Sequence, residues 1–473
     1  MKQYPIYLNG EMVMTAEASD VINPATGELI ARMSTTDRPG LARAMVDAHT
    51  AWSGWRRLTG RDRGQFLHRV ADRLEERRED LARTITLENG KPLAQSVGEI
   101  AMSIDHLRWF AEEARRAYGR IVPHQAEGKR NLVIKSPLGV IGAISPWNFP
   151  LALAVRKVAP ALAAGNTVIL KPAAQTPLSA VALAECIDAA GLPPGVFQML
   201  VGPPDEFGRE MLENPLCRKV TFTGSTAVGR QLISGAAAGV KPLSLELGGH
   251  APVLVFDDAD LARAVEGTIV AKFRNTGQSC IAANRIFVQR GIYDPFVTAF
   301  AARASALKVG NGLEPGVEIG PLIDERGLQR ALDQIADAVG RGARLVCGGE
   351  RLTGAGYFLA PTVIADVTPH SICHREETFA PIAPITPFDD EEQAIAMAND
   401  SIYGLSAYAF TSDLSRAFRL MESLEAGTIG INDGLPTTSQ SPFGGIKQSG
   451  WGRELGSEGL DAFLETKHVS LGL

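Results

Sequence analysis

Short apolar strands alternate with helices from residue 138 onward, and this alternation limits the fold more than any other feature. Five strands are expected before residue 248, at 139–144, 167–170, 196–200, 219–223 and 243–247. A strand that runs parallel to its predecessor needs a crossover helix, so this order indicates a parallel sheet covered by helices. We therefore predict an α/β fold.

A second run of strands and helices begins near residue 250. It opens with the apolar segment 252–256, continues through a helix predicted over 259–275, and includes the strand 285–288. Residues 41–117 instead have apolar positions at helical spacing among many Arg and Glu residues, which predicts helices with solvated outer faces. The length of the chain suggests two to three domains.

Charge and cysteine usage exclude several classes of protein. The chain has 473 residues and a net charge of −6, so a clustered basic surface for nucleic acid is not expected. The N-terminus shows strand-like alternation without the apolar segment of a secretion signal, which predicts a cytoplasmic protein that enters no membrane. Five cysteines without paired spacing argue against both a disulfide framework and a metal site.

Two segments place reactive side chains about one α/β unit apart. Glu246 lies in the sequence L-E-L-G-G, and Cys280 ends the sequence F-R-N-T-G-Q-S-C. A thiolate attacks an aldehyde directly, and a carboxylate with a raised pKa can activate the water that later releases the acyl group. Taken singly, a core cysteine and a solvated glutamate are the simpler interpretations.

Five more segments surround this pair in a characteristic order. They are S-P-W-N-F-P at 145–150, V-I-L-K-P-A-A at 168–174, F-T-G-S-T-A-V-G at 222–229, E-E-T-F-A-P at 376–381 and S-P-F-G-G-I-K at 441–447. In this order, and over essentially its whole length, the chain resembles the NAD(P)-dependent aldehyde dehydrogenase superfamily. Within it, the chain is most similar to the succinate semialdehyde dehydrogenases.

The resemblance implies a Rossmann-type parallel sheet for the cofactor, an α/β catalytic domain and a small oligomerisation element. We assign residues 1–117 and 139–247 to the cofactor domain and residues 248–453 to the catalytic domain. Residues 118–138 and 454–473 would form the oligomerisation element. A homo-oligomer, either a dimer or a tetramer, is therefore expected.

The resemblance also implies a mechanism. Cys280 would attack the aldehyde, and the side-chain amide of Asn148 would stabilise the resulting oxyanion together with the Cys280 backbone N–H. Glu246 would then activate the water that hydrolyses the thioester. On the residues alone, Asn148 could instead cap the following helix, and Glu246 could be a strand-end carboxylate bound to backbone N–H groups.

A larger set of residues matches the cofactor site of the family. This site is expected where the strands of the first sheet run into helix N-termini. Glu377 and Phe379 match positions that hold the nicotinamide ribose and ring. The whole set is Ile144, Ser145, Pro146, Trp147, Lys171, Ala174, Gly224, Ser225, Gly229, Leu247, Glu377 and Phe379.

Ala174 departs from the family pattern. Relatives commonly carry a glutamate there, which binds the adenosine ribose together with the lysine that corresponds to Lys171. Without this carboxylate, nothing repels a 2′-phosphate, and Lys171 can pair with it. We therefore expect NAD or NADP as cofactor, with NADP accepted and a preference for it left open.

Three further residues match substrate positions of the succinate semialdehyde dehydrogenases. Arg156, Arg274 and Thr437 correspond to the two arginines and the serine that bind the far carboxylate there. Arginine suits a carboxylate, and two buried arginines would be costly without an anion. The resemblance thus implies oxidation of succinate semialdehyde to succinate. Glutarate semialdehyde or a sulfonate-bearing aldehyde such as sulfolactaldehyde would suit the same positions.

The residues by themselves leave three different interpretations open. The two arginines could be ordinary surface or salt-bridged residues. A CoA-acylating dehydrogenase would lack the hydrolytic glutamate, which this chain keeps as Glu246. A non-catalytic protein on the same scaffold would have lost the nucleophile, which this chain keeps as Cys280.

Overall fold

The computed structural model describes residues 1–473, and its first large sheet has the strand order β22-β12-β11-β8-β9-β10-β2-β3. The five inner strands are parallel, whereas the edge strands pair antiparallel. The predicted α/β fold with a parallel sheet is confirmed. The strands are β2 (Ile6–Leu8), β3 (Glu11–Val13), β8 (Val140–Ile144), β9 (Thr167–Lys171), β10 (Phe197–Met199), β11 (Cys217–Thr223), β12 (Leu243–Glu246) and β22 (Gly450–Trp451).

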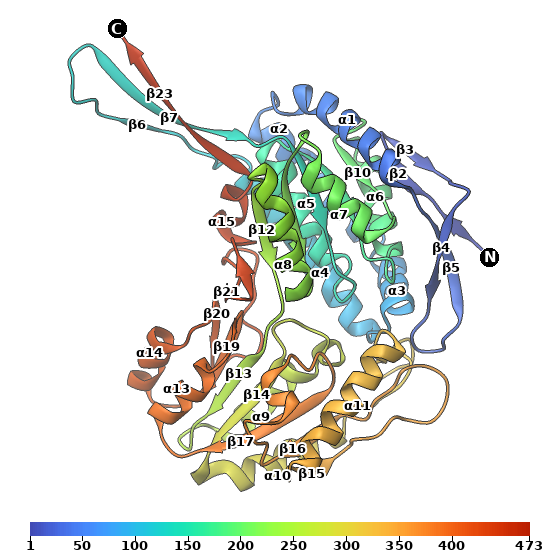
Figure 1. Cartoon of the computed structure of the whole chain (residues 1–473), viewed down its shortest axis with the longest axis vertical. Helices are drawn as coiled ribbons and strands as arrows, with labels where there is room; N and C mark the ends of the chain where they lie inside the picture. Colours follow the sequence, from blue (N-terminus) through green and yellow to red (C-terminus); the bar gives the residue numbers. More distant parts are fainter.

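Helices cover both faces of this sheet (Figure 1). α5 and α6 pack on one face with α2, α3 and α4 outside them, and α1, α7 and α8 pack on the other. Asp37, Thr59 and Ser225 each cap a helix by accepting a backbone N–H of its first turn. The helices are α1 (Arg38–Trp55), α2 (Gly60–Glu76), α3 (Arg78–Asn89), α4 (Leu93–Glu113), α5 (Ala152–Ala164), α6 (Leu178–Ala189), α7 (Pro204–Glu213) and α8 (Thr226–Ala236).

The second large sheet has the order β15-β16-β17-β14-β13-β19-β20. All neighbouring strands are parallel except β15, which pairs antiparallel with β16. The strands are β13 (Ala251–Val255), β14 (Ala283–Gln289), β15 (Arg344–Cys347), β16 (Thr362–Ala365), β17 (Ile382–Phe388), β19 (Ser406–Phe410) and β20 (Thr428–Ile431).

Successive residues of this sheet bury opposite faces. Val253 and Val255 belong to the apolar cluster under α9 and α10, whereas Leu254 and Phe256 belong to the cluster under α13 and α14. The sheet is therefore buried on both sides, as a parallel sheet requires. The helices here are α9 (Leu261–Phe273), α10 (Tyr293–Ser305), α11 (Glu325–Gly340), α12 (Ile372–Arg375), α13 (Glu391–Asn399) and α14 (Leu414–Ser423).

An arm of three antiparallel strands projects from the body of the molecule (Figure 1). Its strands are β6 (Arg120–Val122), β7 (Lys129–Pro137) and β23 (Leu464–Gly472), and α15 (Gly456–Asp461) precedes the last of them. β23 pairs with β7 along its whole length, from Leu464 opposite Pro137 to Gly472 opposite Lys129. The arm thus joins two segments that lie far apart in the sequence.

Smaller elements complete the chain. A three-stranded sheet contains β1 (Gln3–Tyr4), β4 (Ala18–Ile22) and β5 (Leu29–Ser34), and a two-stranded sheet contains β18 (Tyr403–Gly404) and β21 (Ile446–Lys447). Three short 3₁₀ helices are η1 (Ala237–Gly239), η2 (Arg274–Gly277) and η3 (Arg290–Ile292). None of the helices is long and apolar enough to span a membrane.

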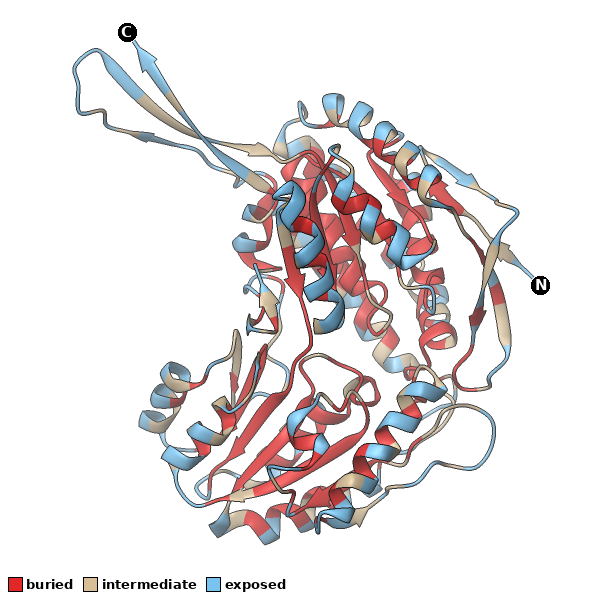
Figure 2. Ribbon diagram, viewed as in Figure 1, coloured by how far each residue is buried: buried red, intermediate tan, exposed pale blue.

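Buried residues concentrate in the two large sheets and the helix faces that touch them (Figure 2). The largest apolar cluster is built on the first sheet, and separate clusters cover the two faces of the second. β22 pairs with β12 of the first sheet although its residues fall in the range 248–453. The domain limits drawn from the sequence stay a prediction.

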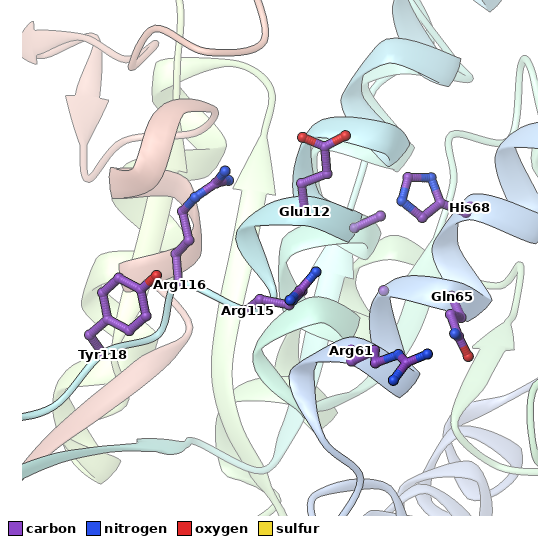
Figure 3. A pocket seen from close by; sticks show the side chains of 9 residues that line it. Arg61, Gln65, His68, Glu112, Arg115, Arg116 and Tyr118 are labelled. Atoms are coloured by element: carbon purple, nitrogen blue, oxygen red, sulfur yellow. The ribbon is translucent and has the colours of Figure 1, made fainter.

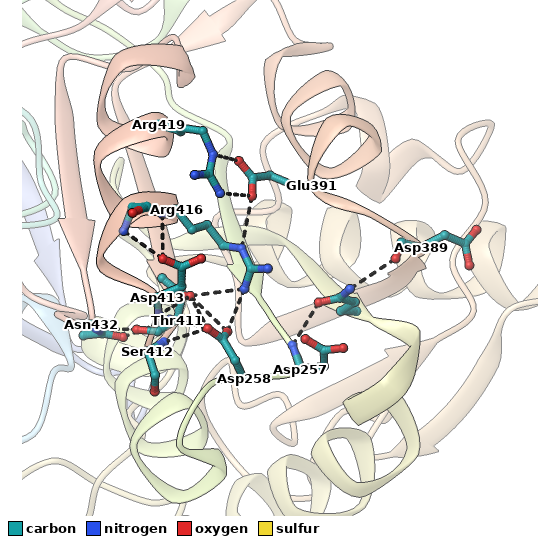
Figure 4. A network of polar contacts seen from close by, with 12 residues as sticks. Asp257, Asp258, Asp389, Glu391, Thr411, Ser412, Asp413, Arg416, Arg419 and Asn432 are labelled. Carbon is teal, nitrogen blue, oxygen red and sulfur yellow. Dashed lines mark hydrogen bonds and ion pairs between the residues drawn. The ribbon is translucent and has the colours of Figure 1, made fainter.

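A carboxylate organises the loops that leave β13 and β19 (Figure 4). Asp258 accepts hydrogen bonds from the Thr411 hydroxyl at 2.8 Å and from the backbone N–H groups of Ser412 and Asp413 at 3.2 and 2.9 Å. Its other oxygen accepts one from Arg416 at 2.8 Å. One side chain thereby connects the exits of two strands to the start of α14.

We expect Asp258→Ala to destabilise the protein. Several donors would lose a charged acceptor, and such hydrogen bonds contribute about 1.5–3 kcal/mol each when they are well buried, less at this half-exposed position. The midpoint of thermal unfolding should fall by a few degrees. Asp257→Ala is the matched control, because this neighbouring exposed carboxylate makes no such contacts. Equal midpoints of thermal unfolding for both variants would contradict the role of Asp258 in connecting these loops.

Candidate active site

Cys280 follows a loop with an unusual backbone conformation. Asn275, Thr276 and Gly277 have successive positive φ angles of 53°, 58° and 73°. Non-glycine residues adopt this conformation at a cost, so surrounding contacts must hold it. At Gly277 a Cβ atom would come within 2.2 Å of the Ala380 carbonyl oxygen, so only glycine fits there. The loop therefore holds Cys280 in a defined position.

The sulfur of Cys280 borders a small cavity of about 70 Å³. Burial raises the pKa of its thiol to about 12, and the carboxyl groups of Glu377 and Glu246 act in the same direction, against the attraction of Arg156. The thiol is therefore protonated near neutral pH. Nucleophilic attack requires a base that takes this proton.

Asn148 lies in the loop between β8 and α5, directly beside the Cys280 loop. Asn148 Nδ2 donates to the Gln278 carbonyl at 3.1 Å. The backbone carbonyl of Asn148 accepts from Asn275 Nδ2 at 2.8 Å. The Asn148 side chain makes no hydrogen bond to the first turn of α5, so it does not cap that helix. The second N–H of the amide is free to donate to an oxyanion next to Cys280.

A buried ion pair supports the Asn148 loop. Lys91 Nζ lies 2.6 Å from Glu99 and donates at 2.7 Å to the Asn148 carbonyl. The other Glu99 oxygen accepts from the N–H groups of Leu151 and Ala152 at 3.0 and 3.1 Å, at the start of α5. Both charges are fully buried, and each has additional hydrogen bonds, as a stable buried pair requires.

Glu246 ends β12 and has an environment suited to a base. Burial raises its pKa well above the usual range, and the nearby Glu454 raises it further, while Lys157, Arg156 and Arg453 oppose the shift. Lys157 and Glu454 form a buried ion pair at 2.6 Å. Glu246 Oε2 is buried without a hydrogen-bond partner, so this carboxylate is not held by backbone N–H groups.

Polar groups meet at the carboxyl ends of the parallel strands of the first sheet. Ile144 ends β8, Lys171 ends β9, and the Ser145 N–H donates to the Lys171 carbonyl at 3.1 Å. Ser145 Oγ and Thr223 Oγ1, at the ends of β8 and β11, are buried without partners. Unpaired hydroxyls at this edge of a parallel sheet suit a dinucleotide, whose polar groups would pair with them.

Two glycines shape the turn from β11 into α8. The Gly224 N–H donates to the Glu246 carbonyl at 3.0 Å, and Ser225 caps the helix by accepting from Val228 N–H at 3.4 Å. A Cβ at Gly229 would come within 2.5 Å of Leu247, so the helix packs closely on the end of β12. The N-terminus of α8 is thus exposed at the carboxyl ends of the parallel strands. A helix N-terminus in this position suits a phosphate group.

Lys171 is the last residue of β9, and Ala174 lies in the turn that follows it. Ala174 is exposed in the turn, and Lys171 is largely buried with no hydrogen-bond or ion-pair partner for its ammonium group. Burial lowers the pKa of Lys171 to about 8. A bound anion would favour the charged form, so this lysine suits a phosphate.

Glu377 and Phe379 approach the same edge from the second sheet. Glu377 Oε1 accepts from the Gly249 N–H at 3.1 Å, and burial raises its pKa to about 7. The Phe379 ring packs edge-on against Trp147 with ring centroids 5.5 Å apart. Pro146 and Trp147 are half-buried. Residues that follow strands of the two sheets therefore meet at this edge, and Glu377 lies close enough to Cys280 for its charge to raise the pKa of the thiol.

The three residues predicted to bind substrate lie together at the cavity of Cys280. Arg156, Arg274 and Thr437 border it, together with Met102 and the apolar residues Phe149, Leu153, Ile281, Leu435 and Phe443. A larger cleft of about 880 Å³ shares Met102, Arg274, Leu435 and Thr437 with this cavity and leads to solvent. The cleft therefore reaches the cavity of Cys280 beside Arg274 and Thr437.

Neither arginine has a carboxylate partner. Arg156 is buried with its guanidinium carbon 4.8 Å from the centre of the Phe443 ring, and Arg274 lies 5.0 Å from that of Phe149. No ion pair joins either one to an acidic side chain. Thr437 Oγ1 is also buried without a partner. These are not surface or salt-bridged arginines, and the cavity keeps their positive charge.

Comparison with known proteins places the chain in a family. The sequence profile of the aldehyde dehydrogenase family matches residues 13–469. The chain is 49% identical over 452 residues to glutarate-semialdehyde dehydrogenase of Pseudomonas aeruginosa, covering 96% of this chain and 94% of that protein. The chain belongs to the aldehyde dehydrogenase family.

Two Escherichia coli proteins extend this similarity. A succinate-semialdehyde dehydrogenase named for NADP(+) is 48% identical over 98% of this chain and 97% of its own length. The crystal structure of an NADP-dependent enzyme superposes with a TM-score of 0.98 at 47% identity, covering 100% of this chain and 98% of that one. The predicted family and fold are confirmed, and this aldehyde dehydrogenase is an NAD(P)-dependent oxidoreductase.

Several residues of the aldehyde dehydrogenase site have no signal in the sequence. The pairs Lys91–Glu99 and Lys157–Glu454 join residues whose spacing does not indicate a contact. His106 receives a hydrogen bond from Arg156 at 3.2 Å, yet in the sequence it is one more polar position in a helix. Only the fold shows that these residues support the predicted ones.

A second hollow of this aldehyde dehydrogenase lies between α2 and α4 (Figure 3). Its volume is about 640 Å³, and its polar lining includes Arg61, His68, Glu112 and Arg115. It shares no residue with the cavity of Cys280 or with the adjoining cleft. It therefore does not contribute to the candidate active site.

Proposed function

We propose that this enzyme oxidises a short aldehyde with an anionic far end, and that the aldehyde is succinate semialdehyde. The observation that carries the proposal is the pair of arginines without carboxylate partners, Arg156 and Arg274, in the cavity of Cys280. Two like charges in a buried cavity are unfavourable until an anion binds between them. The small volume of the cavity favours a short chain.

The first step is attack by Cys280 on the aldehyde carbon. Burial raises the pKa of the thiol, so its proton must pass to water as the sulfur attacks, because the thiolate is the nucleophile. The developing oxyanion would accept the free N–H of the Asn148 amide and the Cys280 backbone N–H. Bound NAD or NADP supplies the hydride acceptor.

The second half of the reaction is hydrolysis of the thioester. Glu246 would remove a proton from the attacking water, and its unpaired Oε2 leaves an acceptor position for that water. The buried pair of Lys157 and Glu454 lies behind Glu246 and keeps a second carboxylate close to it. A retained hydrolytic glutamate disfavours CoA acylation, and a retained nucleophile disfavours a non-catalytic role.

Glutarate semialdehyde and sulfonate-bearing aldehydes are the alternative substrates. A guanidinium fork binds a carboxylate and a sulfonate with similar geometry, so charge alone does not separate them. The relative from P. aeruginosa is named a glutarate-semialdehyde dehydrogenase, and the relative from E. coli is named a succinate-semialdehyde dehydrogenase. We place succinate semialdehyde first because Arg156, Arg274 and Thr437 match the substrate positions of the succinate semialdehyde dehydrogenases.

NADP is proposed as an accepted cofactor. Lys171 presents an ammonium group without a partner, and Ala174 leaves no carboxylate near it. A 2′-phosphate would meet a positive charge and no repulsion. The side chain at position 174 would therefore control the kinetic preference between NAD and NADP.

A homo-oligomer is proposed through the arm. An isolated three-stranded sheet gains little stability alone, and Tyr118 and Ile121 beside β6 are 73% and 74% exposed. A second copy would cover these residues. We also propose that the division 1–117 with 139–247, 248–453, and 118–138 with 454–473 describes the three units, and that the enzyme works in the cytoplasm.

Glu246→Gln should separate the two halves of the reaction. The variant keeps the shape of the side chain but cannot accept a proton, so thioester hydrolysis should become limiting. Rapid-mixing measurements should then show a burst of reduced cofactor before a slow steady state. Cys280→Ala is the control and should lose both phases while it still binds cofactor. An unchanged burst and steady state would exclude Glu246 as the base.

Ala174→Glu should shift the cofactor ratio. The new carboxylate offers an acceptor to the ribose hydroxyls and repels a 2′-phosphate. The ratio of kcat/KM for NADP to that for NAD should fall about tenfold or more, which corresponds to about 1.4 kcal/mol. Ala174→Gln is the matched control, because it adds similar bulk without charge. A ratio that stays constant would place the cofactor selectivity elsewhere.

Arg274→Ala should discriminate between charged and uncharged substrates. Removal of one guanidinium should cost on the order of 2–4 kcal/mol in kcat/KM for succinate semialdehyde. Butanal has the same number of carbon atoms but no carboxylate, so it should lose far less. We call the pair Arg156 and Arg274 the anion clamp. Equal losses of kcat/KM for the two aldehydes would refute binding of the anion by this clamp and leave the dehydrogenase assignment intact.

A further inference from the structure

A chain of hydrogen bonds runs from Arg156 to the mouth of the cleft. Arg156 Nε donates to His106 Nε2 at 3.2 Å, and His106 Nδ1 lies 2.7 Å from Ser439 Oγ. The Ser439 hydroxyl donates to the carboxylate of Asp105, which is exposed in the cleft. His106 and Ser439 are both buried. The buried end of the chain is thus a substrate-facing arginine.

The partners determine the form of the histidine. A guanidinium only donates hydrogen bonds, so His106 Nε2 must accept and carries no proton. Nδ1 then carries the ring proton and donates it to Ser439, whose own hydroxyl proton goes to Asp105. Each donor in this series of hydrogen bonds has one acceptor, and the imidazole of His106 is neutral. Burial lowers the pKa of His106 well below its usual value, and the neighbouring Arg156 lowers it further.

Two buried lysines beside the active site are held differently. Lys91 is paired with Glu99, and Lys157 with Glu454, each at 2.6 Å. A carboxylate partner fixes the position of a cation and also cancels its charge. His106 does only the first of these for Arg156, because a neutral acceptor orients the guanidinium without cancelling its charge. Glu454, Glu246 and Glu99 attract that charge from a distance, and none of them forms an ion pair with it.

We propose that His106 is a positioning residue that sets the preference for anionic aldehydes, with Ser439 and Asp105 fixing its tautomer. This inference rests on the proposed function, in which Arg156 binds the far anion. His106 borders the adjoining cleft but not the cavity that holds Cys280, and it acts on that cavity through the hydrogen bond that it accepts from Arg156. The specificity of the clamp therefore depends on a neutral side chain behind it.

Three replacements separate position from charge. His106→Gln keeps an acceptor for Arg156 and a donor for Ser439, so activity should stay within about threefold of the wild type. His106→Glu adds a carboxylate that pairs with Arg156, so kcat/KM for succinate semialdehyde should fall at least tenfold. His106→Leu removes the acceptor and should cause an intermediate loss. In both damaged variants the change should lie in KM and hardly in kcat.

Butanal and succinate complete the test. kcat/KM for butanal should change less than threefold in every variant, because this aldehyde does not use the clamp. Calorimetry should show weaker binding of succinate to His106→Glu than to His106→Gln, which measures the clamp without turnover. His68→Leu, a histidine in the hollow between α2 and α4, is the control and should match the wild type (Figure 3).

Two outcomes would overturn the inference. If His106→Glu and His106→Gln have the same ratio of kcat/KM for succinate semialdehyde to butanal, the neutral charge of His106 has no role. If the loss lies in kcat and affects both aldehydes equally, His106 serves stability alone. Failure of the proposed substrate class is distinguishable, because then Arg274→Ala would also leave this ratio unchanged. His106→Gln and His106→Glu decide the question even if His106→Leu does not fold.

Discussion

The buried ion pair between Lys91 and Glu99 connects the parts on which the active site depends. Lys91 holds the carbonyl of Asn148, and Glu99 accepts the first N–H groups of α5, the helix that carries Arg156. The Asn148 carbonyl in turn accepts from Asn275 in the loop before Cys280. One buried pair thus fixes the relative positions of Asn148, Arg156 and the loop before Cys280. Loss of either partner would leave an uncompensated charge in the core.

Electrostatic opposition organises the rest of the site. Burial and neighbouring carboxyl groups raise the pKa of both the Cys280 thiol and Glu246, whereas the arginines on the far side of the cavity carry unneutralised positive charge. In the proposed function, an anionic substrate would lower the energy of that arrangement when it binds, with its aldehyde end beside the sulfur. The binding preference and the reactivity of the site therefore follow from one uneven distribution of charge.

The sequence motifs predicted the site residues but not the neighbouring residues that hold them in position. Cys280, Glu246 and Asn148 lie in motifs whose order is typical of the family, and the family is confirmed, whereas their roles stay a prediction. Whether Asn148 was a helix cap, or Arg156 a surface residue, could not be decided before the fold was known, since both depend on what lies beside them in space. His106 gave no signal, because a buried histidine in an amphipathic helix looks like any polar position until its partners Arg156 and Ser439 are known.

The amino-acid order determined the elements. Apolar runs of strand length between helical segments specify parallel sheets, because crossover helices must bury both faces. Gly277 meets a backbone contact that no other residue allows. Alternation and helical spacing are local properties, so they can be read along the chain. Tertiary structure decided which charges are compensated. Lys91 and Lys157 meet carboxylates and Arg156 meets a neutral histidine, a difference that arises only when packing removes water and brings these segments together.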